Sequence, residues 1–193
     1  MPSSHDYIKD KRNKNIKIFI NNKFYSRDKA KVSVFDSSVI LGDGIWSGIR
    51  FHNNKFLFLK DHLDRLFDDA KKISLKIHLS KKQISKILHD TVIINKMKTD
   101  VHLRLVVSRG IKSTPYQDPA FTISKPTIIV IPEYKQPQDN IYRKGLVLKT
   151  VKTIRGPHNV QDPRINSLSK LNCIIACIEA KKQKADEALM FDI

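Results

Sequence analysis

Cysteine is scarce in this chain of 193 residues, which contains only Cys173 and Cys177, four positions apart. A zinc-type metal site needs more ligands nearby, and a disulfide within one helix would constrain little. We therefore expect reduced thiols packed in or near a core, as suits a reducing compartment. No metal site is predicted.

Long apolar runs are also missing. No window approaches the roughly 18 uncharged apolar residues of a membrane-spanning helix. The polar start "MPSSHDYIKDKRNKN" lacks the apolar region of a secretory signal. Hydrophobic residues make up 40% of the chain, which is ordinary for a globular protein. These features predict a cytoplasmic protein with no membrane partner.

Acidic residues are outnumbered, since 36 Lys and Arg face 19 Asp and Glu for a formal charge of +17. Such a charge is compatible with nucleic-acid binding. However, only nine of these basic residues are arginine, they are spread along the whole chain, and no aromatic stacking platform accompanies them. We expect salt-sensitive attraction to polyanions and no specific nucleic-acid partner.

Short β patterns dominate the first part of the chain. Residues 1–15 are predicted to be a disordered polar arm. "IKIFINNKFYS" predicts a hairpin that turns at Asn21 and Asn22, and "KVSVFDSS" predicts a third short strand. A second hairpin is predicted at Asn53 and Asn54, just after a glycine-containing turn region.

Two helices and a strand follow. An amphipathic helix is predicted from Asp61 to Lys76, and Ser80 with Gln83 forms a capping-box pattern ahead of a second helix. "VHLRLVVSRG" alternates as a strand, so His102 and Arg104 should share one face, opposite apolar residues.

The domain organisation predicted from these patterns is α+β. "PTIIVIPEY" is read as a buried strand ended by Pro132, which closes an N-terminal two-layer α/β domain at residues 16–133. A linker at 134–145 leads to an incomplete C-terminal domain at 146–193. This second part should hold a helix from about Ser167 to Lys182 and a final strand, "EALMFDI".

Four segments occur in a characteristic order: "ILGDGIWSGIR", "FLKDHLDRLFDDAKKI", "VHLRLVVSRG" and "INSLSKLNCIIACIEAKKQKADEALMFD". Together they resemble the fold-type IV (class IV) pyridoxal-phosphate aminotransferases, which include branched-chain and D-amino-acid aminotransferases and aminodeoxychorismate lyase. The resemblance covers roughly residues 16–193. It implies pyridoxal 5'-phosphate as cofactor, an amino acid and a 2-oxo acid as substrates, and a homodimer or a complementing C-terminal fragment as partner. It also implies that residues 146–193 are the opening part of a second, β-barrel-like domain.

The resemblance also implies roles for three residues. Arg65 of "HLDRL" would contact the cofactor phosphate, and a guanidinium fork suits that anion. The alternative is a surface arginine paired with Asp61 or Asp69. Trp46 would line the substrate pocket, unless it is simply a core anchor. Arg104 would handle the substrate carboxylate, unless it is a solvated residue of the strand face.

Two positions depart from the branched-chain pattern. Ser47 stands where these enzymes usually carry glutamate, and Leu41 stands where they often carry tyrosine. A branched-chain substrate is therefore only one candidate.

The lysine position departs as well. The family places its cofactor-binding lysine in a pattern close to I-K-S-L, and here Asn166 occupies it. A carboxamide is neither nucleophilic nor basic enough to form an imine with an aldehyde. Lys170 lies four residues on, so on a helix its β-carbon would lie about 5–6 Å away on the same face. It is thus either a replacement lysine or a solvated one.

The resemblance places further cofactor-binding groups beyond the "EALMFD" strand, so we expect the 193-residue chain to lack them and to be marginal as a monomer. Three functions stay open. The first is an aminotransferase that uses Lys170. The second is a catalytically inactive or truncated member that acts as an assembly subunit, completed by a C-terminal fragment. The third is an aminodeoxychorismate-lyase-like enzyme, which also needs the lysine.

Overall fold

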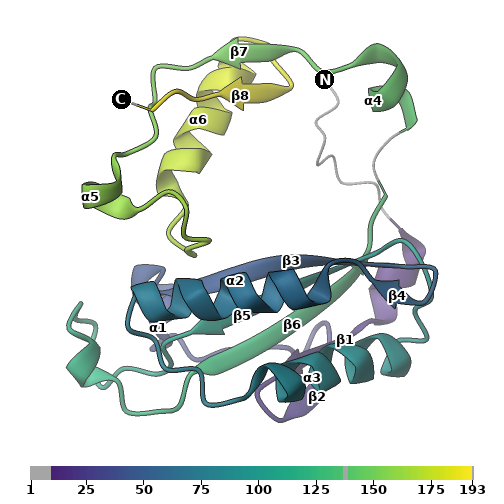
Figure 1. The fold of residues 1–193 in the computed structure, drawn as a ribbon, viewed down its shortest axis with the longest axis vertical. Coiled ribbons are helices and arrows are strands. Elements are labelled where there is room, and N and C mark those ends of the chain that lie inside the picture. Colours follow the sequence, from purple (N-terminus) through teal and green to yellow (C-terminus); the bar gives the residue numbers. More distant parts are fainter. Residues whose placement is uncertain (1–9, 137–138, 193) are drawn as a thin grey trace. The chain divides into compact units, whose positions relative to one another are not determined.

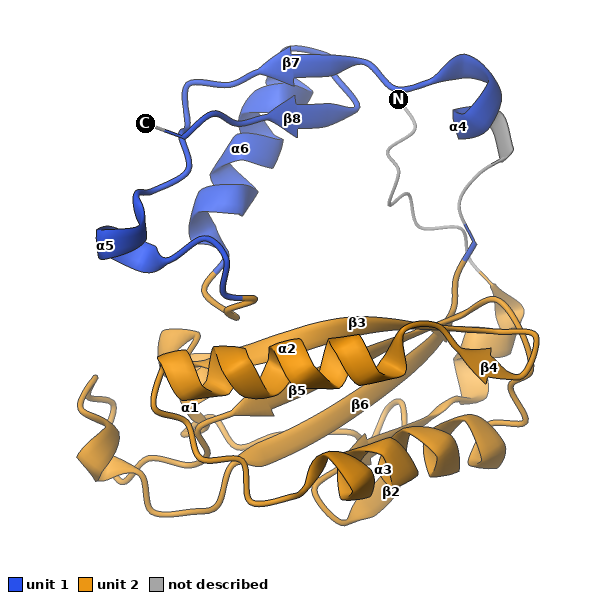
Figure 2. Ribbon diagram, viewed as in Figure 1, with its two compact units in different colours: residues 1–9, 136–165, 170–193 blue, residues 10–135, 166–169 orange. Residues whose placement is uncertain are grey.

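The computed structural model describes residues 10–136 and 139–192, and it divides them into two compact units (Figure 2). Unit 2 contains residues 10–135 together with 166–169. Unit 1 contains the remaining described residues. The division assigned from the sequence did not anticipate that a short piece of the C-terminal segment, 166–169, belongs with the N-terminal sheet.

Unit 2 is built around one antiparallel sheet with strand order β2-β1-β6-β5-β3-β4 (Figure 1). In chain order its elements are η1 (Lys11–Asn15), β1 (Lys17–Ile20), β2 (Lys23–Ser26), α1 (Ser37–Leu41), β3 (Gly44–His52), β4 (Lys55–Phe56), α2 (Leu59–Lys72), α3 (Lys81–Ile94), β5 (Val101–Ser108), η2 (Pro119–Phe121) and β6 (Thr127–Tyr134).

Alternating burial confirms the predicted pleat of β5. Leu103, Leu105 and Val107 are fully buried, whereas His102 and Arg104 lie on the opposite face. Helix α2 packs on β3, α3 packs on β1 and β6, and the two helices touch each other (Figure 1). The helices therefore cover the apolar face of the sheet and leave the His102 face without helical cover from this unit.

The predicted hairpins and capping box are confirmed. Asn21, Asn53 and Asn54 adopt left-handed backbone, with φ values of 55°, 49° and 61°. Asparagine tolerates this conformation better than most residues, which is why these pairs turn the chain. Ser80 and Gln83 exchange the reciprocal hydrogen bonds of a capping box at the start of α3.

The third strand predicted at "KVSVFDSS" is wrong. Residues 31–35 form no strand, and Asp36 caps the short helix α1 by accepting a hydrogen bond from the Ser38 amide at 2.9 Å. The other carboxylate oxygen of Asp36 accepts from Thr127 Oγ1 at 2.7 Å. A buried carboxylate that links α1 to β6 outweighs the strand propensity of the valines.

Two further boundaries differ from the predictions. Strand β6 continues past Pro132 to Tyr134, and Pro132 still lies opposite Leu103 of β5. On the other side, β1 pairs only with Ile129 and Val130, so it requires no N–H from the proline. Residues 11–15, assigned to a disordered arm, form η1, where the Asn13 side chain bonds both the amide and the carbonyl of Tyr134. Residues 1–9 of that arm lie outside the described residues.

Helix α2 also begins earlier than predicted. It starts at Leu59 rather than Asp61 and ends at Lys72 rather than Lys76. Its N-cap, Phe58, has left-handed backbone and makes no capping hydrogen bond through its side chain. Asp61 lies instead in the first turn, where a carboxylate favours the helix dipole.

Unit 1 is smaller and contains α4 (Asp139–Lys144), β7 (Leu148–Thr150), α5 (His158–Gln161), α6 (Leu171–Lys182) and β8 (Glu187–Leu189). β7 and β8 pair in parallel, and the small core beside them gathers Val151, Ala176, Ala180 and Ala185. Both cysteines are free thiols, as predicted, but Cys177 is exposed rather than packed in a core, because α6 buries its alanine side instead.

No helix within 10–136 or 139–192 combines the length and the apolar character that a bilayer crossing requires.

Candidate active site

Residues 166–169 form an additional edge beside the first residues of β3. The Trp46 amide donates to the Asn166 carbonyl at 2.9 Å, and the Leu168 amide donates to the Gly44 carbonyl at 2.9 Å. An isolated bridge pairs Ile45 with Ser167 between them. The backbone of β3 therefore holds this segment, although the two are far apart in the sequence.

Gly44 makes this close approach possible. A β-carbon at that position would lie 2.7 Å from Leu168 Cδ1 and 2.7 Å from the Val107 carbonyl oxygen. Real β-carbons do not approach backbone atoms so closely, so a larger residue would push the segment off β3. Gly44, the first residue of β3, thus permits the docking of residues 166–169.

Asn166 is fixed on its amide side as well. Its N–H donates to Asp69 Oδ2 at 3.1 Å, and the Asp69 side chain is almost fully buried on α2. The carboxamide of Asn166 makes no hydrogen bond to another residue within the described ranges. The structure thus clamps the main chain at this position and leaves its side chain out of the clamp.

The helical relation predicted between Asn166 and Lys170 is wrong. Helix α6 begins at Leu171, and Lys170 is its N-cap with φ −119° and ψ 17°. Residues 166–168 pair with β3, so they cannot also adopt the helical backbone that this relation requires. Lys170 belongs to unit 1 and is partly buried, and its role as a replacement lysine stays a prediction.

Arg65 lies in a pocket along α2. The pocket has a volume of about 330 Å³ and is lined by Phe58, Asp61, His62 and Arg65. These residues recur at helical spacing on one flank of α2, beside its buried stripe. Phe58 is 75% exposed and has φ 52°, a backbone conformation that is uncommon outside glycine and is often found at binding sites.

The surface ion pairs considered for Arg65 do not form within the described part of the chain. Asp69 lies 3.7 Å from Lys72 Nζ instead, and no ion pair joins Arg65 to Asp61. The guanidinium is exposed and faces the pocket, so it can bind an anion in two-point geometry.

His62 was not singled out from the sequence, although it opens the "HLDRL" motif. Its Nδ1 lies 3.1 Å from Ser47 Oγ on β3, and Ser47 is almost fully buried. Burial lowers the pKa of His62, the positive charge of Arg65 lowers it further, and Asp61 opposes the shift. The ring is therefore neutral at neutral pH.

Trp46 and Arg104 form a second group on the sheet face opposite α2. The Arg104 guanidinium carbon lies 4.0 Å from the centroid of the Trp46 ring, a cation–π contact. Burial lowers the pKa of Arg104, while Glu133 on β6 opposes the shift. A guanidinium remains charged under all ordinary conditions, so this face presents a cation stacked on an aromatic ring.

Gly48 leaves room for this group. A β-carbon there would lie 2.7 Å from His102 Nε2 and 3.4 Å from the Trp46 ring. The predicted residues therefore form two clusters rather than one: Arg65 beside α2, and Trp46 with Arg104 across the sheet. They are linked through β3 and Asn166, since the Trp46 amide donates to the Asn166 carbonyl and the Asn166 N–H donates to the Asp69 carboxylate.

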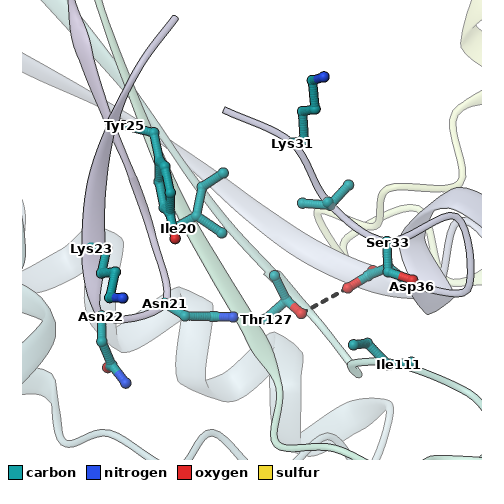
Figure 3. Close-up of a pocket in the computed structure, with 11 residues that line it drawn as sticks. Ile20, Asn21, Asn22, Lys23, Tyr25, Lys31, Ser33, Asp36, Ile111 and Thr127 are labelled. Carbon is teal, nitrogen blue, oxygen red and sulfur yellow. Dashed lines mark hydrogen bonds between the residues drawn. The ribbon is translucent and has the colours of Figure 1, made fainter. Parts of the chain in front are cut away.

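A second pocket of about 330 Å³ lies elsewhere in unit 2 and contains none of the predicted site residues (Figure 3). Lys23, Lys31 and Tyr25 stand at its rim, and Asp36 and Thr127 lie at its floor. The Asp36 carboxylate already accepts hydrogen bonds from Ser38 and Thr127, so this floor is a junction between α1 and β6.

Within residues 10–136 and 139–192, no three His, Cys, Asp or Glu side chains gather in a group that could hold a metal ion.

Comparison with known proteins identifies what this geometry resembles. Residues 44–193 match the family described as amino-transferase class IV. The chain is 38% identical over 175 residues to branched-chain-amino-acid aminotransferase-like protein 1 of Arabidopsis thaliana, covering 90% of this chain and 31% of that protein.

Solved structures of the same kind share the fold. The branched-chain aminotransferase of Thermoproteus uzoniensis with norvaline matches with TM-score 0.78 and 25% identity, over 92% of this chain and 60% of that one. The branched-chain amino acid aminotransferase of Thermobaculum terrenum in its PLP form matches with TM-score 0.74 and 19% identity, over 93% and 60%. The chain thus spans about 60% or less of the length of these proteins.

Proposed function

Since the chain belongs to the class IV aminotransferase family, we propose that it takes part in amino-group transfer between an amino acid and a 2-oxo acid, with pyridoxal 5'-phosphate as cofactor. Branched-chain amino acids are the narrower proposal for the substrate, supported by the names of the relatives. Ser47 and Leu41, which depart from the usual branched-chain residues, weigh against that choice.

The observation that carries this proposal is the Arg65 pocket. Its exposed guanidinium has no competing ion pair among the described residues, and it lies within a cavity of about 330 Å³. The geometry of a guanidinium fork matches that of a phosphate group. When bound, pyridoxal 5'-phosphate supplies an electron sink for bonds at the amino-acid α-carbon.

The residues fit the phosphate end of this cofactor and do not fit its covalent attachment at position 166. The Asn166 carboxamide cannot react with the aldehyde. In this proposal Lys170 is the amine that would hold the cofactor, Trp46 shapes the side-chain pocket, and Arg104 attracts the substrate carboxylate. The Trp46 stack supports the last role, because it positions the Arg104 cation on the open face of the sheet.

Trapping with borohydride tests the proposal. The wild-type chain is mixed with pyridoxal 5'-phosphate, reduced, digested and analysed by mass spectrometry. Selective labelling of Lys170, removed by Lys170→Ala, is the expected result if the chain is catalytic. Labelling spread evenly over surface lysines would contradict the role of Lys170.

The second candidate is a catalytically inactive family member that serves as an assembly subunit. It is favoured by Asn166, because the clamped peptide keeps the local structure without the amine. An even labelling pattern in the same experiment would support it. An aminodeoxychorismate-lyase-like reaction needs the same amine, so the Lys170 result decides that alternative too.

A homodimer, or completion by a separate C-terminal fragment, is the proposed assembly. The first is supported by exposed apolar residues on two adjoining segments of unit 2: Val34, Phe35, Val39, Tyr116, Phe121 and Ile123. The second is supported by exposed isoleucines on α6: Ile174, Ile175 and Ile178. Sedimentation equilibrium should show a dimer that Val34→Glu dissociates, and a monomer at all concentrations would contradict the homodimer.

A cytoplasmic location completes the proposal. It is supported by the two free thiols, Cys173 and Cys177, one of which is exposed.

A further inference from the structure

The histidine of the Arg65 pocket has a hydrogen-bonding partner on the sheet, at one of its two ring nitrogens. His62 and Arg65 lie one helical turn apart on α2, and both line the pocket. On its other side, His62 Nδ1 meets Ser47 Oγ of β3 at 3.1 Å. The ring therefore bridges the buried sheet and the pocket.

We propose that His62 is a second anion-binding residue of this pocket, donating its Nε2 proton to a phosphate group beside Arg65, while Ser47 orients the ring through Nδ1. The identity of the anion as a cofactor phosphate rests on the proposed function. The anion site itself does not.

The hydrogen-bonding capacity of the two groups explains the coupling. A neutral imidazole has one donor and one acceptor nitrogen, and a serine hydroxyl can serve as either. When Ser47 donates to Nδ1, the proton of His62 is on Nε2, the nitrogen that is left for the pocket. An anion that accepts from Nε2 therefore selects this tautomer, and Ser47 stabilises it.

The charges around His62 favour a neutral ring when no anion is bound and a protonated ring when one is bound. Arg65 and Asp61, both on α2, are the charged groups that act on the ring, and β3 offers only the uncharged Ser47. Because burial and Arg65 lower the pKa of His62, the ring is neutral at neutral pH. A bound dianion offsets Arg65 and raises that pKa, so anion affinity should increase as the pH falls through it.

A nucleophilic serine activated by histidine is the other chemistry that this pair suggests. The structure does not favour it, because Ser47 is only 1% exposed and a nucleophile must be reached by its substrate. The pair therefore serves binding rather than covalent catalysis.

Sulfate is a suitable probe, because its charge stays constant through the range in which His62 titrates, unlike that of phosphate. In the full chain labelled with ¹⁵N-histidine, the ring signals of His62 are followed by NMR against pH, with and without sodium sulfate at fixed ionic strength. We expect sulfate to raise the pKa of His62 and to shift its tautomer toward Nε2–H. An unchanged titration curve would overturn the proposal.

Substitutions distinguish a residue that binds the anion from a residue that only orients the His62 ring. His62→Gln should weaken sulfate binding about tenfold or more, the effect of one hydrogen bond to an anion. Ser47→Ala should change the tautomer ratio of free His62 and weaken binding less. His89 lies on α3 outside the pocket, so His89→Gln should leave sulfate affinity unchanged. Equal losses in all three variants would contradict a specific role for His62.

The outcome is independent of amino-group transfer, since sulfate binding requires no lysine. If Lys170 is never labelled but sulfate raises the pKa of His62, the anion site stands and the enzymatic proposal fails. If Lys170 is labelled and sulfate leaves the pKa of His62 unchanged, only the proposed role of His62 fails. Should His62→Gln not fold, the wild-type titration alone decides.

Discussion

Replacing Asn166 with lysine is expected to give the chain a covalent attachment point for pyridoxal 5'-phosphate that it lacks at this position. The peptide around residue 166 is clamped by Trp46 and Asp69, with hydrogen bonds of 2.9 and 3.1 Å. The carboxamide takes no part in that clamp within the described residues, so the substitution removes no contact that holds the segment. The new amine would thus be presented from a fixed backbone.

The measurement is borohydride trapping with peptide mapping on a Lys170→Ala background, so that Lys170 cannot contribute. Label at residue 166 should exceed that at an introduced control lysine, Gln161→Lys, by about tenfold or more, because a preorganised amine reacts faster than a solvated one. Gln161 is exposed and lies in unit 1. Equal labelling of the two lysines would show that position 166 does not face a cofactor site.

Arg65→Gln is expected to weaken non-covalent binding of pyridoxal 5'-phosphate about 10- to 100-fold. A hydrogen bond between charged groups contributes about 1.5–3 kcal/mol. The arginine fork can make two such bonds to a phosphate, and the expected range corresponds to the net loss of one, because the glutamine amide can still donate. Within the described residues Arg65 makes no ion pair with Asp61, so its loss should cost affinity rather than stability.

Net charge is the main confounding factor, because the chain carries a formal charge of +17. Lys71→Gln removes one positive charge from an exposed position of the same helix and serves as the matched control. Isothermal titration calorimetry at physiological salt should show at most a twofold change for this control. If both variants lose the same affinity, the effect of Arg65 is general electrostatics, and the phosphate role is contradicted.

Much of unit 2 could be predicted because its signals are local. The alternation of "VHLRLVVS" placed Leu103 and Leu105 on the buried face and Arg104 on the other, since the strand period of two is written into consecutive residues. The turn asparagines and the capping box at Ser80 were predicted for the same reason, because each acts over two or three positions.

Predictions failed where a distant partner outweighed the local preference. The helix expected from Ser167 begins at Leu171 because residues 166–168 pair with β3. The strand expected at "KVSVFDSS" is lost because Asp36 bonds Thr127, 91 positions away. Neither partner is visible in a window of ten residues.

The candidate site shows the same division. The sequence alone determined that residue 166 is a carboxamide and that an arginine stands in "HLDRL", because chemical identity needs no fold. Only the tertiary structure decided that Asp69 bonds the peptide of Asn166 from 97 positions away, and that Ser47 meets His62. Side chains on different elements become neighbours only when burial of the apolar faces brings α2 onto β3, and no local pattern encodes which polar groups then meet.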